Sequence, residues 1–348
     1  MRWMSLSTVL LLGLVGLSGC DRSSAPAKPK LNLYIWSEYI PPSVLEEFAK
    51  RTGIAVKVDT YDSNETLLQK IQSGVAQYDL CVPTDYMIRI MIQQKLLRKI
   101  DPAKFPGLAN ISPRFQKRSF DPDNQYSVPY LWGTTGLGYN KQAITGGIDS
   151  WAAIFDEKHK GKILMLDDMR ECFAAALKSM GKSLNATDEP TLRAAAELLK
   201  KQKALVKTYN SGDFDNILAA GDVIIAHGYN GQLAKLAARQ PDKFAYVIPR
   251  EGCTISQDGL CIPANAPHPE AAERFMAYIL EPATAAAIVN GIHYASTNEA
   301  AKALIEPAIV KDPAVYPLDD ALKNAELMRD LGVATQLMDR LWTEIKAQ

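Results

Sequence analysis

Short apolar segments alternate with amphipathic helical segments along the first part of this 348-residue chain. Strand-like patterns cover residues 31–35, 54–61 and 78–84, and helical patterns between them begin at Pro42 and Asn64. A further helix is expected after the last of these strands. Strands that alternate with helices in this way form a parallel sheet with crossover helices. The sequence therefore predicts an α/β fold.

Local signals mark the ends of the first two helices. Pro41 and Pro42 suit a first helical turn, and Gly53 is a natural stop for the helix that follows. Asn64 is expected to cap the second helix, which closes near Gly74.

The junction between the first strand and its helix carries Trp36, Ser37, Glu38 and Tyr39. The carboxyl ends of strands are where open α/β sheets usually hold ligands. One interpretation is that the two rings only plug the top of a core, as most aromatic side chains do. The other is a wall for a cation with an apolar stem, with ring faces, the Glu38 charge and a Ser37 hydrogen bond. Both remain open from these residues alone.

Chain length and net charge bear on the number of lobes and on the class of ligand. A chain of 348 residues exceeds one ordinary core, so two lobes are expected. Lys plus Arg equals Asp plus Glu at 39 each, which leaves no surplus of positive charge for nucleic-acid binding. Three glycines interrupt the strand-like run 126–140, so we expect it to bend and to cross between the lobes.

A second α/β set is expected from Trp151 onward. Its predicted strands are 162–166, 222–227, 244–248 and 259–263, and its predicted helices are 169–180, 189–201 and 231–239. Mostly helical sequence follows to the end of the chain.

The first twenty residues have the layout of a signal peptide. Arg2 precedes an apolar run over 9–17 that is too short to span a bilayer, and the segment ends at Cys20. An ordinary secretory signal is one interpretation. The other is a bacterial lipoprotein signal in which Cys20 is lipidated and Asp21 retains the protein at the inner membrane. Residues 21–30 then form a polar tether that reaches about 17 Å on average.

Motifs for catalysis or metal binding do not stand out. The four later cysteines have no zinc-ligand spacing and the four histidines are scattered, so we expect no metal. The glycines do not form a nucleotide fingerprint, and no nucleophile elbow occurs. We therefore predict a protein without a cofactor that is not an enzyme.

Three carboxylates at expected strand ends have two interpretations each. Asp168 and Glu171 match an acidic capping box at a helix start, or they form a pair that holds an ammonium group. Two carboxylates would be needed there, because a helix N-terminus repels cations. Asp258 is either a solvated loop acid or a third carboxylate of the same site.

Several stretches together closely resemble one family. They are Trp36–Pro42, Thr60–Thr66, Tyr78–Leu80 with Val82–Pro83, Phe120–Asn140, Asp167–Asp168 with Arg170–Glu171, Asn230–Gly231 and Ile262–Ala266. In this order they resemble the spermidine/putrescine-binding proteins of bacterial ABC importers. The resemblance covers nearly everything after the tether.

The resemblance implies a two-lobe type II periplasmic binding protein fold with a ligand cleft between the lobes. Lobe 1 is expected to comprise 31–135 plus 259–300, and lobe 2 to comprise 136–258 plus 301–348. The implied ligand-binding residues are Trp36, Ser37, Glu38, Tyr39, Thr84, Tyr86, Asp168, Glu171, Tyr229, Asp258 and Tyr294. In that topology Cys81 lies near Cys261 and Cys172 near Cys253, and we expect at least one of these pairs to be close enough to bridge.

Three positions depart from the family pattern. Ser256 replaces an aromatic residue, Tyr229 replaces a tryptophan and Met328 replaces a glutamine, so the acids are kept while the ring sandwich is thinner. Together with the signal-peptide layout, the resemblance implies a monomeric, lipid-anchored protein of the periplasm (or cell surface) that captures a polyamine and delivers it to an ABC importer permease. An amine-sensing receptor, or a binding-fold enzyme that acts on an organic amine, is the alternative.

Overall fold

The computed structural model describes residues 29–75 and 77–347. The predicted signal peptide, Cys20 and nearly all of the tether lie outside the described residues. The strands are β1 Lys30–Trp36, β2 Ala55–Tyr61, β3 Leu80–Cys81, β4 Ser127–Asn140, β5 Ile163–Met165, β6 Val206–Tyr209, β7 Ile225–Tyr229, β8 Phe244–Val247, β9 Thr254–Cys261, β10 Ala295–Ser296 and β11 Glu326–Leu327. The α-helices are α1 Pro42–Thr52, α2 Asn64–Ser73, α3 Asp85–Gln93, α4 Met169–Ser179, α5 Glu189–Lys203, α6 Phe214–Ala220, α7 Asn230–Arg239, α8 Pro269–Ile279, α9 Pro282–Ile292, α10 Pro307–Val310 and α11 Ala334–Ala347.

The strands pair in the order β2-β1-β3-β9-β4-β7-β5-β6, with β10 and β8 also on β4 and β11 on β9. β1, β2 and β3 are parallel, as are β5, β6 and β7, which confirms the predicted crossover pattern in both parts. β9 runs antiparallel to β3 and β4.

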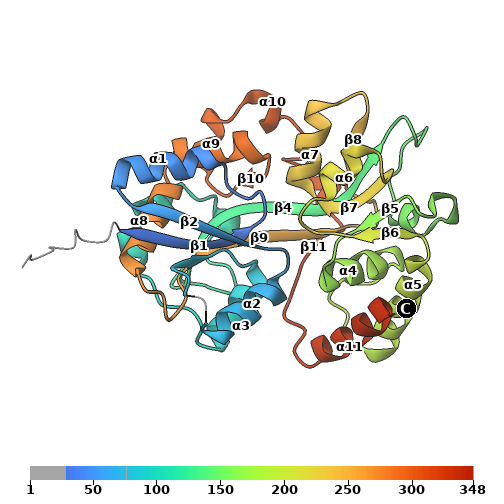
Figure 1. The fold of residues 1–348 in the computed structure, drawn as a ribbon, viewed down its shortest axis with the longest axis horizontal. Helices are drawn as coiled ribbons and strands as arrows, with labels where there is room; N and C mark the ends of the chain where they lie inside the picture. Colours follow the sequence, from blue (N-terminus) through green and yellow to red (C-terminus); the bar gives the residue numbers. More distant parts are fainter. Residues whose placement is uncertain (1–28, 76, 348) are drawn as a thin grey trace, which may run out of the picture.

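The long strand β4 joins two halves of the molecule. Residues 127–134 pair with β9, whereas residues 135–140 pair with β7 and β8. In Figure 1, β4 and β9 run through the middle, with β1 and β2 at one end and β5 to β7 at the other. The expectation that 126–140 carries a crossing agrees with this pairing.

Helices cover both faces of the strands in each half. Around β1 and β2 they are α1 and α9 on one side and α2 and α3 on the other; around β5 and β7 they are α6 and α7 opposite α4, α5 and α11 (Figure 1). Each half has its own apolar core. Phe48 of α1 packs edge-on against Phe275 of α8, and Phe173 of α4 is buried with Met338 of α11 in the other core.

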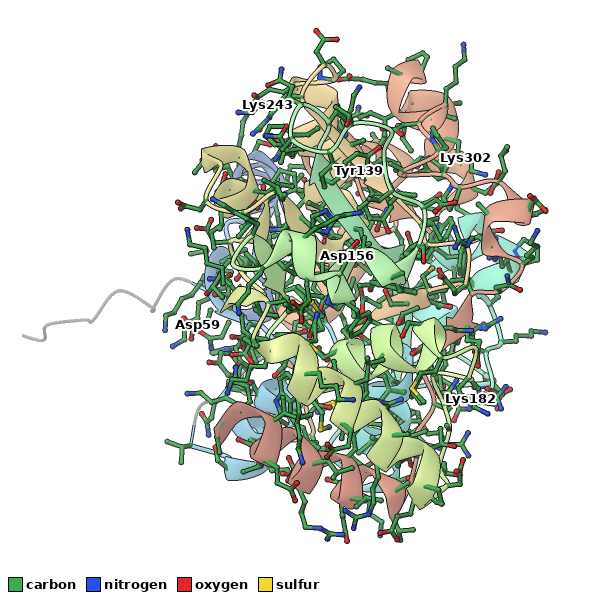
Figure 2. All side chains as sticks on the ribbon, turned by 90° about the vertical axis from the view of Figure 1, so that its right-hand side faces the viewer. Asp59, Tyr139, Asp156, Lys182, Lys243 and Lys302 are labelled. Carbon is green, nitrogen blue, oxygen red and sulfur yellow. The ribbon has the colours of Figure 1, made fainter. Side chains whose placement is uncertain are left out.

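The C-terminal segment contributes to both cores. Ile305, Ile309 and Val315 pack in the first core, although the expected boundaries place 301–348 in lobe 2. Leu341 and Ile345 of α11 pack in the second core, where α11 lies beside α5 (Figure 2). The chain therefore returns from one half to the other between residues 315 and 341.

Charged side chains of both signs are spread around the face seen in Figure 2, among them Asp59, Asp156, Lys182, Lys243 and Lys302. Within residues 29–75 and 77–347 no single helix is long and apolar enough to cross a membrane; α8 and α9 meet that condition only as a pair bent by 80°.

Several element boundaries differ from the sequence-based expectation. The cap of α2 is Ser63, whose side chain accepts a hydrogen bond from the Thr66 N–H; Asn64 instead turns its side chain toward Thr84. β3 is only two residues long, and β9 begins at Thr254 rather than at residue 259. Gly53 and Gly74 end their helices in the left-handed conformation, as predicted.

The cysteines lie as neighbours without forming a disulfide. Cys81 and Cys261 face each other across β3 and β9, which confirms their expected proximity, and Cys172 shares the second core with Cys253. All four thiols are buried and free, so neither pair is joined by a disulfide in this structure.

Candidate functional site

A cavity lies at the strand ends where the two halves meet. Its walls come from both halves and from the C-terminal segment. It is lined by Trp36, Ser37, Tyr39, Tyr61, Asn64, Thr84, Tyr86, Asp168, Glu171, Ser211, Tyr229, Gln232, Thr254, Ser256, Asp258, Tyr294 and Met328.

Ten of the eleven predicted site residues line this cavity. Glu38 is the exception: it adopts a φ of 53° in the turn after β1, and its side chain is exposed. The expected place of the Glu38 carboxylate beside the rings is therefore not confirmed.

Trp36 and Tyr39 form one end of the aromatic wall. The Trp36 indole N–H donates to the Val82 carbonyl at 2.9 Å, so its polar group is satisfied while its ring borders the cavity. Tyr39 meets Tyr294 edge-on at 4.8 Å between ring centroids, and Trp36 lies 6.2 Å from Tyr229. Tyr39 belongs to the first core and also lines the cavity, so the two interpretations of these rings are compatible.

Asp258 is held by two hydroxyl groups on the floor of the cavity. The Tyr39 hydroxyl donates to one carboxylate oxygen, and the Thr84 hydroxyl donates to the other at 2.7 Å. The Asn64 amide donates to the Thr84 hydroxyl in turn, at 3.1 Å. Burial raises the pKa of Asp258 to about 6, against the effect of both hydroxyl donors. Asp258 is thus a buried strand residue, not a solvated loop acid.

Asp168 and Glu171 differ in their contacts: Asp168 caps a helix, and Glu171 does not take part in capping. Asp168 caps α4, since its carboxylate accepts from the Glu171 N–H at 3.0 Å. The Glu171 side chain does not complete a capping box. Its two oxygens instead accept from the Thr135 and Thr254 hydroxyls, each at 3.0 Å.

Burial disfavours the ionised form of both acids. Burial raises the pKa of Asp168, and the Glu65 carboxylate adds to that rise. Burial also raises the pKa of Glu171, with the Asp168 charge as the next cause. A positive charge bound beside them favours their ionised forms. The site is therefore suited to an organic cation.

Five cavity residues were not predicted: Tyr61, Asn64, Ser211, Gln232 and Thr254. Thr254 could have been found, because Thr254, Ser256 and Asp258 alternate along β9 and so share one face. Ser211 and Gln232 lie outside any recognisable motif. Among the described residues, the Ser211 hydroxyl and the Gln232 amide nitrogen are buried without a hydrogen-bond partner.

An acidic hollow adjoins the cavity and shares Ser37, Tyr61 and Ser211 with it. Its wall carries the carboxylates of Asp62, Asp167 and Asp213. Acidic side chains around an opening raise the local concentration of cations. No group of three His, Cys, Asp or Glu side chains arranged to hold a metal ion occurs within residues 29–75 and 77–347.

Known proteins are similar to this chain in both sequence and fold. The chain is 36% identical to a spermidine/putrescine-binding periplasmic protein of Escherichia coli, over 97% of each chain. A solved structure from Listeria monocytogenes, assigned to a spermidine/putrescine ABC transporter, superposes with a TM-score of 0.87 at 36% identity and covers 91% of this chain and 98% of its own. The Tp0655 lipoprotein of Treponema pallidum gives a TM-score of 0.81 at 29% identity, over 92% and 100% of the two chains.

These likenesses confirm the expected type II periplasmic binding protein fold. The family model for bacterial extracellular solute-binding proteins matches residues 43–317. With its cavity between two α/β halves, this chain belongs to the bacterial extracellular solute-binding proteins.

Proposed function

We propose that this protein binds a polyamine of the putrescine or spermidine type outside the cytoplasm and delivers it to an ABC importer. The observation that carries the proposal is the joint placement of three buried carboxylates and an aromatic wall around one cavity. Asp168, Glu171 and Asp258 supply negative charge for ammonium groups, and the rings contact the methylene stem. The named relatives that bind spermidine and putrescine support the same ligand class.

Ser256 and Met328 bear on the choice of polyamine. Both line the cavity, at positions where the resemblance implies a ring and an amide. The acids remain in place, so selection for a cation is kept, while one ring fewer encloses the stem.

We also propose that the two halves act as lobes that close over the ligand. Trp36 and Tyr39 border the cavity from the first half, and Asp168 and Glu171 border it from the second. A ligand that contacts both walls favours closure through interactions that an open form lacks.

Calorimetric titration tests the proposal. The protein is titrated with putrescine, spermidine and agmatine, and with lysine as an amine that carries a carboxylate. We expect saturable binding of at least one polyamine and weaker binding of lysine, because its carboxylate would face the buried acids. Absence of heat with every polyamine, together with binding of an acidic or neutral solute, would contradict the proposal.

Lipid anchoring through Cys20 is the second part of the proposal. It is supported by the layout of residues 1–20 and by the similar Treponema pallidum protein, which is a lipoprotein. Labelled palmitate should enter the wild-type protein in cells and not the Cys20→Ala variant. Equal labelling of both would contradict the anchor.

Delivery of the ligand to an importer is tested separately, by measuring polyamine uptake in cells with and without this protein.

A further inference from the structure

A groove lined by four arginines, here called the arginine groove, adjoins the ligand cavity. The four are Arg89 on α3, Arg114 and Arg118 in the segment between α3 and β4, and Arg329 after β11. Three of them are exposed and Arg118 is half-buried. Among residues 29–75 and 77–347, none of the four forms an ion pair with a carboxylate, whereas Arg51 of α1 does so at 2.7 Å. Unpaired positive charges that line one groove attract anions.

The arginine groove lies on the other face of β9 from the cavity. Thr254 and Ser256 of β9 line the cavity, and Ile255 between them lines the groove. Successive side chains of a strand point to opposite faces of the sheet. Tyr86 and Met328 border both spaces. The groove is therefore next to the proposed polyamine site but separate from it.

One wall of the groove is fixed to the first half of the molecule. The guanidinium carbon of Arg114 lies 5.1 Å from the centroid of the Trp132 ring, which belongs to the first core. Arg118 donates to the Arg114 carbonyl at 3.2 Å, so these two arginines are neighbours. Arg89 lies on α3, which packs against α2 in the same half.

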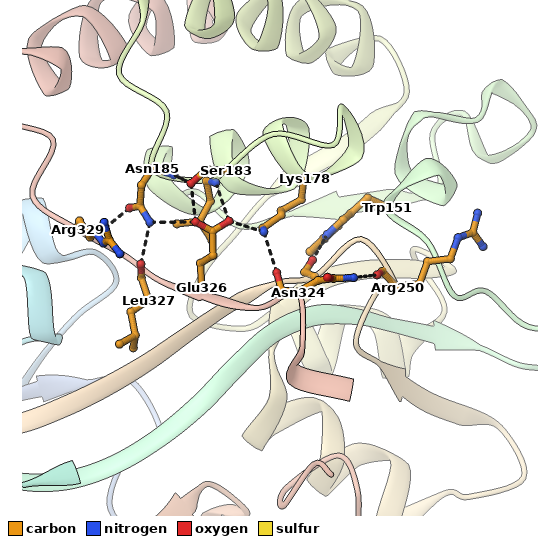
Figure 3. Close-up of polar contacts among 11 residues, drawn as sticks. Trp151, Lys178, Ser183, Asn185, Arg250, Asn324, Glu326, Leu327 and Arg329 are labelled. Carbon is orange, nitrogen blue, oxygen red and sulfur yellow. Dashed lines mark hydrogen bonds and ion pairs between the residues drawn. The ribbon is translucent and has the colours of Figure 1, made fainter. Parts of the chain in front are cut away.

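The opposite wall is fixed to the second half. Asn185 accepts from the Arg329 N–H at 2.8 Å and donates to the Leu327 carbonyl at 2.9 Å (Figure 3). One terminal nitrogen of Arg170, on α4, donates to the Arg329 carbonyl at 3.1 Å. These contacts attach the Arg329 backbone to the half that contains α4. An anion held by Arg118 and Arg329 together would therefore link the two halves.

Three carboxylates also line the groove, but each has other partners. Glu326 pairs with Lys178 of α4 (Figure 3). Asp330 accepts from the Gly332 N–H at 2.9 Å. Asp85 is only 3% exposed and accepts from a backbone N–H of α3 at 2.7 Å. Since none of these contacts uses an arginine of the groove, the four guanidinium groups remain available to a ligand.

We propose that the arginine groove binds a small oxyanion with two or more negative charges, of the phosphate type, through guanidinium groups of both halves. A guanidinium group presents its N–H donors in a planar fork that matches two oxygens of such an anion. The ligand class of the groove is thus opposite in charge to that of the cavity.

The bound anion should also raise polyamine affinity, a part of the inference that rests on the proposed function. The Trp36 ring of the first half lies 6.2 Å from the Tyr229 ring of the second, so the cavity walls are close together in this arrangement. An anion that bridges the halves at the groove stabilises the same arrangement. Two ligands that favour one arrangement strengthen each other's binding reciprocally.

Phosphorus-31 NMR titration with inorganic phosphate tests the anion site, in the whole protein without polyamine and at slightly alkaline pH. We expect saturable binding that Arg118→Gln and Arg329→Gln each weaken roughly tenfold or more, because each loses hydrogen bonds to a charged group. Arg274→Gln on α8 is the matched control and should leave phosphate binding unchanged. Arg274 is exposed, lies outside the groove and forms no ion pair among the described residues.

Calorimetric titration with spermidine tests the coupling between the two sites. Saturating phosphate should tighten spermidine binding about fivefold or more, compared with chloride at equal ionic strength. Arg329→Gln should bind spermidine like the wild type in chloride and should lose the effect of phosphate. Association of phosphate with spermidine in solution is the same for both proteins, so the difference between them reports on the groove.

Each failure has its own signature. Phosphate binding that is absent, or that neither arginine variant weakens, would mean an adventitious ion only and would overturn the site. Binding that depends on Arg118 and not on Arg329 would place the anion on one half and overturn the link between the halves. Phosphate binding without a change in spermidine affinity would overturn the coupling. If the wild type binds no polyamine, the proposed function fails, while the phosphate titration still decides whether the groove is an anion site.

Discussion

Asp258 combines a structural and a proposed binding role in one side chain. Its carboxylate accepts from the Tyr39 and Thr84 hydroxyls, so those two donors hold it in a fixed orientation. Both oxygens retain further acceptor capacity, because an ionised carboxylate has about four lone-pair sites. A bound ammonium would add a charge-assisted hydrogen bond to a carboxylate whose pKa burial raises to about 6.

The Asp258→Asn substitution should therefore weaken polyamine binding at neutral pH. Loss of a hydrogen bond to a charged group costs about 1.5–3 kcal/mol, which is roughly a ten- to hundredfold loss of affinity. Calorimetric titration at pH 7 measures the change. Glu270→Gln is the control, since Glu270 is exposed on α8 and should leave affinity as it is. Equal affinity of Asp258→Asn and wild type would contradict the role of Asp258.

Ser256 tests whether the cavity has room for another ring. Its side chain lines the cavity beside Asp258, opposite Gly133 on β4. Ser256→Trp should tighten polyamine binding about two- to thirtyfold, the range of one added cation–π contact. Ser73→Trp, on the exposed end of α2, should have no effect. Weaker binding by Ser256→Trp, measured beside a still harmful Asp258→Asn, would mean that Ser256 makes room for a bulkier amine.

The sequence predicted a residue's place in the site where a local pattern, such as a strand end or a helix start, indicated it. Trp36 and Tyr39 stand at a strand end, and Asp168 opens a helix, so both positions follow from the order of residues. Glu38 does not follow, because its left-handed backbone conformation is set by the turn and not by its chemistry. Ser211 lines the cavity because of how the loop after β6 packs, and hydrophobic periodicity does not predict loop packing.

At the scale of elements, the backbone at the start of α7 packs closely against the Tyr294 ring. Tyr294 lies against Gly231 in the first turn of α7, and a Cβ atom at Gly231 would come within 2.1 Å of the Tyr294 Cδ2 atom. Tyr294 also lines the cavity and contacts Tyr39 edge-on. The helix start and the aromatic wall are therefore fixed by the same contact.

Gly231→Ala should destabilise the protein and weaken ligand binding together. Alanine favours helix by up to about 1 kcal/mol over glycine, but overpacking costs typically about 1–3 kcal/mol, so we expect a net loss of stability. Urea unfolding gives the free energy of unfolding. Gly212→Ala is the control, since its nearest contact would be the Ser37 Oγ at 3.8 Å. A Gly231→Ala variant as stable as this control would contradict the argument.

The elements themselves were largely predictable, because α1, α2, α4 and α5 carry apolar periods and clear end signals. The cap of α2 moved by one residue because Ser63 competes with Asn64, and the Asn64 amide is engaged by Thr84 from another strand end. β3 and β9 differ from expectation for a similar reason. Their lengths are set by where they pair with β1 and β4, which is a tertiary property.

On the scale of the whole molecule, β4, β9 and the C-terminal segment connect the two halves, and α7 also contacts α9 across them. β4 changes partners between Thr134 and Thr135, so one strand serves both halves. Arg170 of α4 also lies over the Tyr86 ring of α3 and so adds a contact between the halves.

A ligand that touches both walls should stabilise both cores at once. Trp36 packs on the first core, and Asp168 caps α4, which belongs to the second. At a polyamine concentration about 100 times its Kd, binding adds about 2.7 kcal/mol to the free energy of unfolding. For a chain of this size that corresponds to a rise in Tm of roughly 4 °C, observed by differential scanning calorimetry.

The shape of the thermal transition distinguishes a ligand that binds both walls from one that binds a single wall. If the unliganded protein melts in two steps, saturating polyamine should move both steps upward and merge them, because neither core can unfold without losing the ligand. Asp168→Asn should reduce this shift, whereas Glu270→Gln, on α8 and outside the cavity, should keep it. An upward shift of one step alone, with the other unchanged, would mean that the ligand binds a single wall, and the proposed closure of two lobes over it would be wrong.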